Sequence, residues 1–186
     1  MKTVNKREIY FMLTYTGSLL SRIIKRVTRR SYTHVSLGLD PGLKDVYSFG
    51  RKRPKNPIIA GFVREDIKDG VYKVFENTTC TILTYEVNEE QYKKIQGNIE
   101  RFEMDKDSYR YNFLGLWFAS VGLTFNRDKH YFCSEFVATI LEDSDVELFD
   151  KPTSLVSPVD FMDCEELTPV YEGELSKLEP ENMKPL

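Results

Sequence analysis

Histidine, cysteine and tryptophan are scarce in this sequence. The chain has two histidines, three cysteines and one tryptophan among 186 residues. Three cysteines without a CxxC pair or zinc-ligand spacing argue against both a disulfide framework and a structural metal. No apolar run approaches the roughly 20 residues of a membrane span, and no small-residue cleavage site follows the basic start. We therefore expect one soluble domain over residues 1–186 in a reducing, cytoplasmic compartment, with the tail from about Ser176 loosely ordered.

Basic and acidic residues are unevenly distributed along the chain, although the net charge is only -3. Residues 1–64 hold 14 Lys and Arg against 3 Asp and Glu, whereas residues 141–186 hold 3 against 13. Such polarity indicates either a basic surface for an anionic partner or two chain ends that lie side by side. The overall acidity and the lack of a nucleic-acid motif argue against binding of DNA or RNA.

Hydrophobic spacing and turn residues predict a mixture of strands and helices. Helices are expected after the cap residues Ser18 and Asn88, the second with Gln91 in a capping box. Residues 112–123 are expected to form a buried helix, and Ser157 and Pro158 to begin a short one. Residues 51–57 are expected to form an exposed basic loop. Strands are expected at residues 8–15, 33–39, 45–49, 71–76, 80–87 and 169–171, and residues 58–63 form a further apolar stretch.

The helix after Ser18 carries a basic face that includes Arg22, Lys25, Arg26, Arg29 and Arg30. This face is either a rim for an anionic substrate or lipid headgroup, or the solvated side of an ordinary core-packing helix.

Two residues far apart in the sequence have the properties needed for cysteine nucleophilic catalysis. Cys133 falls in the first turn of a helix with Phe132, Phe136 and Ile140 at helical intervals, where the helix dipole favours a thiolate. His34 lies in a short alternating strand, on the same face as Ser36 and Gly38, which leave room for a helix to pack close. The alternative for Cys133 is a small core residue.

The strand Thr33-His34-Val35-Ser36-Leu37 and the helix start Tyr131-Phe132-Cys133-Ser134-Glu135-Phe136-Val137 together resemble the circularly permuted papain-like amidases of the YiiX/YaeF-like group, in the NlpC/P60 superfamily. The histidine strand precedes the cysteine helix, as in the permuted branch. The resemblance covers about residues 9–171. It implies an α+β fold in which an antiparallel sheet packs against the cysteine helix.

A papain-like site also needs a group that orients the imidazole. The best-matching position by resemblance is Ser48, with Glu65 as a rival. Glu135 points roughly 200° around the helix from Cys133 and is expected to be structural, holding a nearby loop through a basic partner. His130 is expected to be a loop residue. The backbone N–H of Cys133, with Tyr15 as a second donor, is expected to bind the oxyanion.

The expected function is thiol-dependent hydrolysis of an amide, isopeptide or related acyl bond, with Cys133 as nucleophile and His34 as base and then acid. No metal or organic cofactor is implied. The substrate is a small molecule, a peptide or a lipid conjugate. Two alternatives remain: acyl transfer to a lipid or small molecule at the same site, or an inactive binding module, which the lack of a strong third residue favours.

Overall fold

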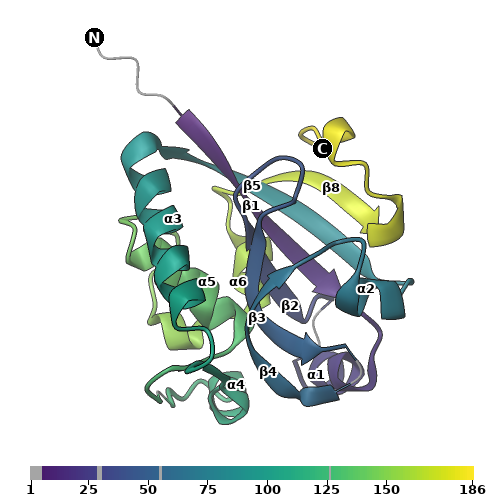
Figure 1. The fold of residues 1–186 in the computed structure, drawn as a ribbon, viewed down its shortest axis with the longest axis vertical. Coiled ribbons are helices and arrows are strands. Elements are labelled where there is room, and N and C mark those ends of the chain that lie inside the picture. Colours follow the sequence, from purple (N-terminus) through teal and green to yellow (C-terminus); the bar gives the residue numbers. More distant parts are fainter. Residues whose placement is uncertain (1–5, 29–30, 55, 126) are drawn as a thin grey trace.

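A six-stranded antiparallel sheet in the order β4-β3-β2-β1-β5-β8 forms the centre of the molecule (Figure 1). The computed structural model describes residues 6–28, 31–54, 56–125 and 127–186. Strands β6 and β7 form a separate, parallel pair. The expected α+β class with an antiparallel sheet is therefore confirmed. The strands are β1 (Lys6–Tyr15), β2 (His34–Gly38), β3 (Val46–Arg53), β4 (Asn56–Glu65), β5 (Thr79–Asn88), β6 (Arg110–Tyr111), β7 (His130–Tyr131) and β8 (Thr168–Glu174).

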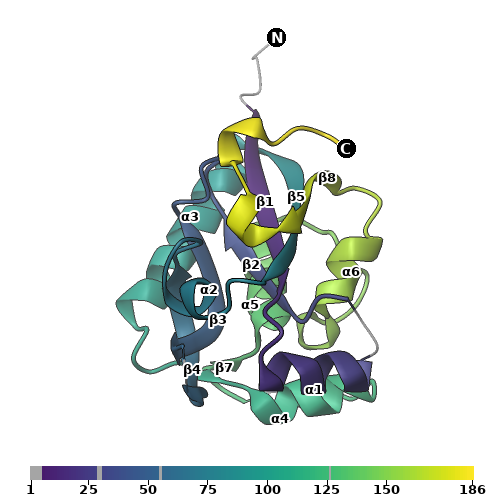
Figure 2. The same ribbon diagram turned by 90° about the vertical axis from the view of Figure 1, so that its right-hand side faces the viewer.

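The two faces of the sheet bury different sets of side chains. One face packs against helices α3, α5 and α6, and the other against α2 and the C-terminal turns (Figures 1 and 2). Among the described residues, no helix is long and apolar enough to cross a membrane. The helices are α1 (Leu19–Thr28), α2 (Gly70–Val74), α3 (Glu89–Met104), α4 (Phe113–Ser120), α5 (Cys133–Glu142) and α6 (Pro158–Asp163), and the short 3-10 turns are Thr153–Leu155, Leu175–Lys177 and Pro180–Asn182.

Local capping signals in the sequence are confirmed at several helix starts. The backbone N–H of Ser21 donates to the Ser18 hydroxyl before α1, and Asn88 with Gln91 forms a reciprocal capping box before α3. Ser157 and Asp160 cap α6 in the same manner. These side chains satisfy the free N–H groups of a first helical turn, which explains why these boundaries could be predicted.

Three predicted segments differ from the structure. Residues 51–57 are not a loop, because Arg51–Arg53 extend β3 and Asn56 begins β4 in a tight hairpin. Residues 71–76 include the helix α2 rather than a strand. The helix within residues 112–123 exists as α4, but it is not buried, since Trp117 is 60% exposed. Arg29, Arg30 and Lys55 of the predicted basic segments lie outside the described residues.

The cysteine helix packs on the opposite face of β2 from the one predicted. Val35 and Leu37 share a core cluster with Phe136 and Val137 of α5, whereas Ser36 points to the other face and hydrogen-bonds Glu65. Large apolar side chains on one face of the strand attract the apolar helix more strongly than the space left by small residues on the other. The tail beyond Ser176 contains a short turn, and Leu178 packs into the second core cluster.

Candidate active site

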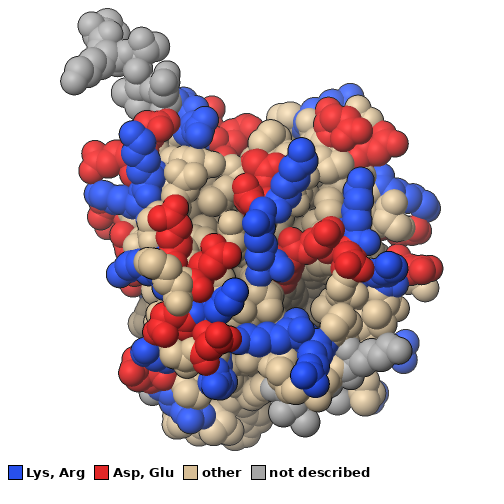
Figure 3. Space-filling model, in the orientation of Figure 1, with Lys and Arg blue, Asp and Glu red and all other residues tan. Residues whose placement is uncertain are grey.

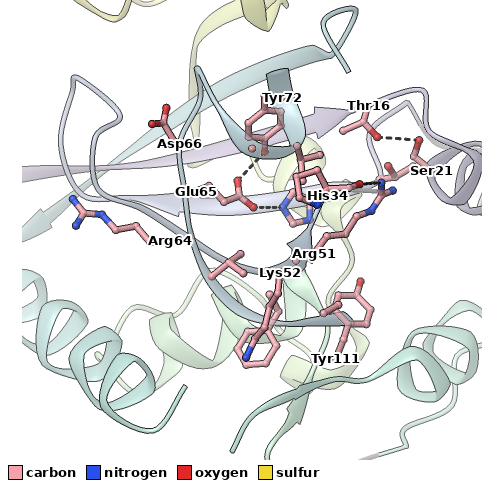
Figure 4. Close-up of a pocket in the computed structure, with 18 of the residues that line it drawn as sticks. Thr16, Ser21, His34, Arg51, Lys52, Arg64, Glu65, Asp66, Tyr72 and Tyr111 are labelled. Atoms are coloured by element: carbon pink, nitrogen blue, oxygen red, sulfur yellow. Dashed lines mark hydrogen bonds and ion pairs between the residues drawn. The ribbon is translucent and has the colours of Figure 1, made fainter. Parts of the chain in front are cut away.

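His34 and Glu65 form an ion pair at the edge of this sheet. His34 begins β2, and Glu65 is the last residue of β4. The Nε2 atom of His34 lies 2.7 Å from Oε1 of Glu65, and their side chains are only 21% and 10% exposed (Figure 4). Because Nε2 faces the carboxylate, Nδ1 is the ring nitrogen that remains for a second partner.

Three hydroxyl groups hold the Glu65 carboxylate in place. Ser36 and Tyr72 donate to Oε2 at 2.8 and 2.7 Å, and Ser48 makes a short hydrogen bond to Oε1. Tyr72 comes from α2, the segment that the sequence predicted as a strand. With His34 on the remaining side, every donor around this carboxylate favours its charged form.

The Cys133 thiol meets His34 from the other side. Cys133 interacts with the His34 imidazole and with the backbone of Val35 and Ser134, and each of these interactions favours the thiolate. Ser134 lies in the first turn of α5, so its N–H belongs to the positive end of the helix. As the first residue of β2, His34 can reach both Glu65 on one face and Cys133 on the other.

The electrostatics of this group favour a thiolate and an imidazolium. For His34, burial lowers the pKa, but the Glu65 charge and hydrogen bonds from Cys133 and Glu65 raise it to about 10. For Glu65, burial raises the pKa, but His34, Ser48 and Tyr72 lower it to about 2. Burial also raises the pKa of Cys133, and the hydrogen bond and charge of His34 bring it below its usual value. For all three side chains, the interactions with their partners therefore outweigh the effect of burial on the pKa.

Tyr111 is a further site residue that the sequence did not single out. It lines the cavity described below and lies close enough to Cys133 for the two groups to influence each other's ionisation. Burial and the nearby Cys133 raise the pKa of Tyr111 well above its usual value, so it stays protonated. A protonated hydroxyl beside the nucleophile can donate a hydrogen bond to the oxygen of a substrate carbonyl. A two-residue strand with no periodicity gives no sequence signal for such a role.

The buried Glu135 connects the start of α5 to the segment that carries Tyr111. Its Oε2 accepts the backbone N–H of Phe132 at 3.2 Å, and its carboxylate is hydrogen-bonded by the Asn112 side chain. Burial raises the pKa of Glu135 to about 7. The predicted structural role of Glu135 fits this position, but its partner is the neutral Asn112 rather than a basic residue. His130 lies in β7, with Nδ1 2.7 Å from the Asp128 carbonyl.

A cavity of about 260 Å³ opens beside this group (Figure 4). His34, Glu65, Tyr72 and Tyr111 line it, whereas Cys133, 1% exposed, is not among its lining residues. Figure 3 shows this face of the molecule hollowed between acidic and basic side chains. The outer wall of the cavity includes Arg51, Lys52, Arg64, Asp66, Asp69 and Phe113.

Two of the predicted assignments are wrong. Ser48 does not face the imidazole: it donates to Glu65, and Glu65 takes the position on Nε2. A carboxylate attracts the imidazolium more strongly than a hydroxyl does, so it holds the inner place. Tyr15 is not among the described residues that line the cavity, and its ring instead lies 4.2 Å from the Lys25 ammonium. Tyr111 is the tyrosine that lines the cavity and interacts with Cys133.

Comparisons with protein-family models, with curated proteins and with solved structures find no match for this chain. Within the described residues, no group of three or more His, Cys, Asp or Glu side chains is arranged to hold a metal ion.

Proposed function

We propose that this chain is a thiol-dependent hydrolase that cleaves an amide, isopeptide or related acyl bond. The observation that carries the proposal is the continuous chain of contacts from Glu65 through His34 to Cys133. A nucleophile beside a base that a third group orients is the general arrangement of covalent acyl-transfer catalysis. The arrangement of a histidine strand before a cysteine helix supports the permuted papain-like fold as part of the same proposal.

In the first half of the reaction, the Cys133 thiolate attacks the substrate carbonyl carbon. A carbon–sulfur bond forms, and the carbonyl electrons move to the oxygen, which the Cys133 N–H and the Tyr111 hydroxyl stabilise. The carbon–nitrogen bond then breaks, and the leaving amine takes a proton from the His34 imidazolium.

In the second half, water hydrolyses the thioester. Neutral His34 removes a proton from the water, the hydroxide oxygen bonds to the acyl carbon, and the carbon–sulfur bond breaks to restore the thiolate. Glu65 stays ionised throughout, because its pKa of about 2 is far below neutrality. It holds the ring orientation and stabilises each imidazolium state.

One observation favours acyl transfer as a second candidate. Cys133 is 1% exposed, which restricts access of water to a thioester at this sulfur. An acceptor bound in the cavity would then compete with water. Conversely, the binding-module alternative loses its main support, because it depended on the lack of a strong third residue and Glu65 fills that position.

A reducing compartment is part of the proposal as well. Cys80, Cys133 and Cys164 are all free thiols. A cytoplasmic setting would keep the Cys133 thiolate reduced and reactive.

The test combines thiol labelling with turnover. Wild-type protein is incubated with a panel of fluorogenic acyl amides and thioesters, and product release and the acylated peptide are followed by fluorescence and mass spectrometry. We expect acylation at Cys133, with loss of turnover in Cys133→Ala and full turnover in the control Cys164→Ala. Acylated enzyme that releases its acyl group only to added amines or alcohols would assign acyl transfer. Turnover that survives Cys133→Ala, or acylation confined to Cys164, would contradict the proposal.

A further inference from the structure

Helix α4 exposes an apolar face beside the candidate active site. Leu114, Trp117 and Val121 follow a spacing of three and four residues, so they share one side of the helix and its C-cap, and they are 52%, 60% and 58% exposed. Leu123, just beyond, is 55% exposed. Single exposed apolar residues are ordinary, but a contiguous group of this kind indicates a contact surface.

Helix α1 adds cationic side chains at the same end of the molecule. Leu19, Arg22 and Arg26 follow the same helical spacing, all three are exposed, and Leu19 is 77% exposed. Within the part of the chain that the structure describes, no carboxylate forms an ion pair with Arg22 or Arg26. Both views place α1 and α4 at the same end of the molecule (Figures 1 and 2), where residues other than Lys, Arg, Asp and Glu cover much of the surface (Figure 3).

The two helices also flank the cavity. Ser21 of α1 and Phe113 at the start of α4 both line it, together with the cationic Arg51 and Lys52. Phe113 is 40% exposed, and its ring centroid lies 4.6 Å from that of Tyr111 in a tilted arrangement. The apolar face, the basic side chains and the cavity mouth therefore form one continuous region.

We infer that this α1–α4 surface docks onto a membrane whose surface carries anionic lipids. A helix face with Trp, Leu and Val suits the boundary between headgroups and acyl chains, where an indole ring is favoured. The neighbouring arginines suit anionic headgroups, which attract each nearby basic side chain. The net charge of -3 opposes nonspecific attraction of the whole protein to an anionic bilayer. The uneven distribution of charge along the chain would instead turn this end toward the bilayer.

Docking in this orientation would place the cavity mouth at the membrane surface. The substrate class that follows is an acyl conjugate anchored in the bilayer, whose scissile bond reaches Cys133 past Phe113 and Tyr111. This second step rests on the proposed function, whereas the docking itself does not. The two can therefore fail separately.

The experiment uses the full chain and vesicles of phosphatidylcholine with or without phosphatidylglycerol. Trp117 is the single tryptophan, so its fluorescence reports directly on this surface. We expect binding and a blue shift with the mixed vesicles and much weaker binding with phosphatidylcholine alone. Leu114→Ser with Val121→Ser should weaken binding at least tenfold, and Arg22→Gln with Arg26→Gln about thirtyfold.

Matched controls come from the other parts of the molecule. Leu186 is 75% exposed near the opposite end, so Leu186→Ser should leave binding unchanged, as should Lys73→Gln with Lys177→Gln. Cys133→Ala should still bind, which separates docking from catalysis. Lack of binding to the mixed vesicles would overturn the inference. So would lipid-independent dimerisation that Leu114→Ser abolishes, because the surface would then be an interface between two copies of the chain.

Discussion

Replacing Glu65 with Gln tests whether the carboxylate activates Cys133 through His34. The substitution keeps the shape and an acceptor oxygen beside Nε2 but removes the charge that raises the pKa of His34 to about 10. Burial, which lowers the pKa of His34, is then opposed only by Cys133, and we expect the pKa of His34 to fall. The imidazolium would no longer be present at neutral pH to stabilise the Cys133 thiolate.

The size of the effect follows from the fraction of thiolate. In the wild type, His34 keeps the pKa of Cys133 below its usual value despite burial. Without the imidazolium, that pKa should rise to about 8.5 or more, so only about 1% of the sulfur is ionised at pH 6.5. Alkylation of Cys133 at pH 6.5 should therefore slow, by at most about 100-fold, which is the limit for a wild-type thiol that is fully ionised at that pH, and the two proteins should converge toward pH 10.

The assay is alkylation with iodoacetamide from pH 5 to pH 10, read at each cysteine by mass spectrometry. Cys80 serves as an internal reference, because burial raises its pKa to about 12. Glu86→Gln, on an exposed pair with Lys6, is the matched control, and thermal unfolding checks that the Glu65 variant is folded. An unchanged pH profile in folded Glu65→Gln would refute the reasoning, since the carboxylate would then not act through His34.

Three further substitutions separate the roles of the surrounding residues. Tyr111→Phe should slow acyl turnover by about 10² while changing Cys133 alkylation by less than about threefold, because alkylation forms no oxyanion; equal losses in both would contradict a role at the oxyanion. Ser48→Ala should keep about a fifth of turnover, since its hydroxyl reaches His34 only through Glu65; a loss as large as that of Glu65→Gln would contradict this. For Glu135→Gln, the free energy of unfolding measured in urea should rise relative to that of the wild type by on the order of 2 kcal/mol as the pH goes from 5 to 8. The sign follows because a folded pKa of about 7 makes ionisation of Glu135 destabilising as pH rises from 4.5 to 7; a pH-independent difference would refute it.

The pH dependence of overall stability follows from the same ion pair. The pKa of Glu65 is lowered from 4.5 to about 2, so its contribution is present above pH 4.5 and is lost as pH falls through 2. The pKa of His34 is raised from 6.5 to about 10, so its contribution is present below pH 6.5 and is lost as pH rises through 10. The pair should therefore stabilise the fold most between about pH 4.5 and pH 6.5.

The parts of the fold that the sequence predicted are those with a local signal. Capping residues at Ser18, Asn88 and Ser157, and the apolar spacing of α5, report interactions within a few residues. The short helix α2 gave no such signal, because Tyr72 is fixed by its contact with Glu65 rather than by its neighbours in sequence. The exposure of α4 was not predictable either, since an apolar helix ordinarily implies burial.

The site residues, too, could be predicted only where the sequence carries a local signal. Cys133 and His34 could be proposed from residue type and local pattern, whereas Glu65 required knowledge of how β3 and β4 pair. Ser48 lies next to the site, but its hydroxyl donates to Glu65 rather than to His34. The pairing of β3 with β4 places the Glu65 carboxylate between the two side chains. Tyr111 is set by the pairing of β6 with β7, which brings it beside the cysteine helix from more than 20 residues earlier in the chain.

Burial alone does not decide which cysteine in this chain is reactive. Cys80 and Cys133 are both buried, at 0% and 1% exposure, and burial raises the pKa of each thiol. In Cys80 burial is unopposed, and that thiol stays neutral. In Cys133 a charged imidazole and the backbone of Val35 and Ser134 reverse the effect. The imidazole is charged only because Glu65 lies on its far side, so the reactivity of Cys133 depends on a carboxylate across the sheet from it.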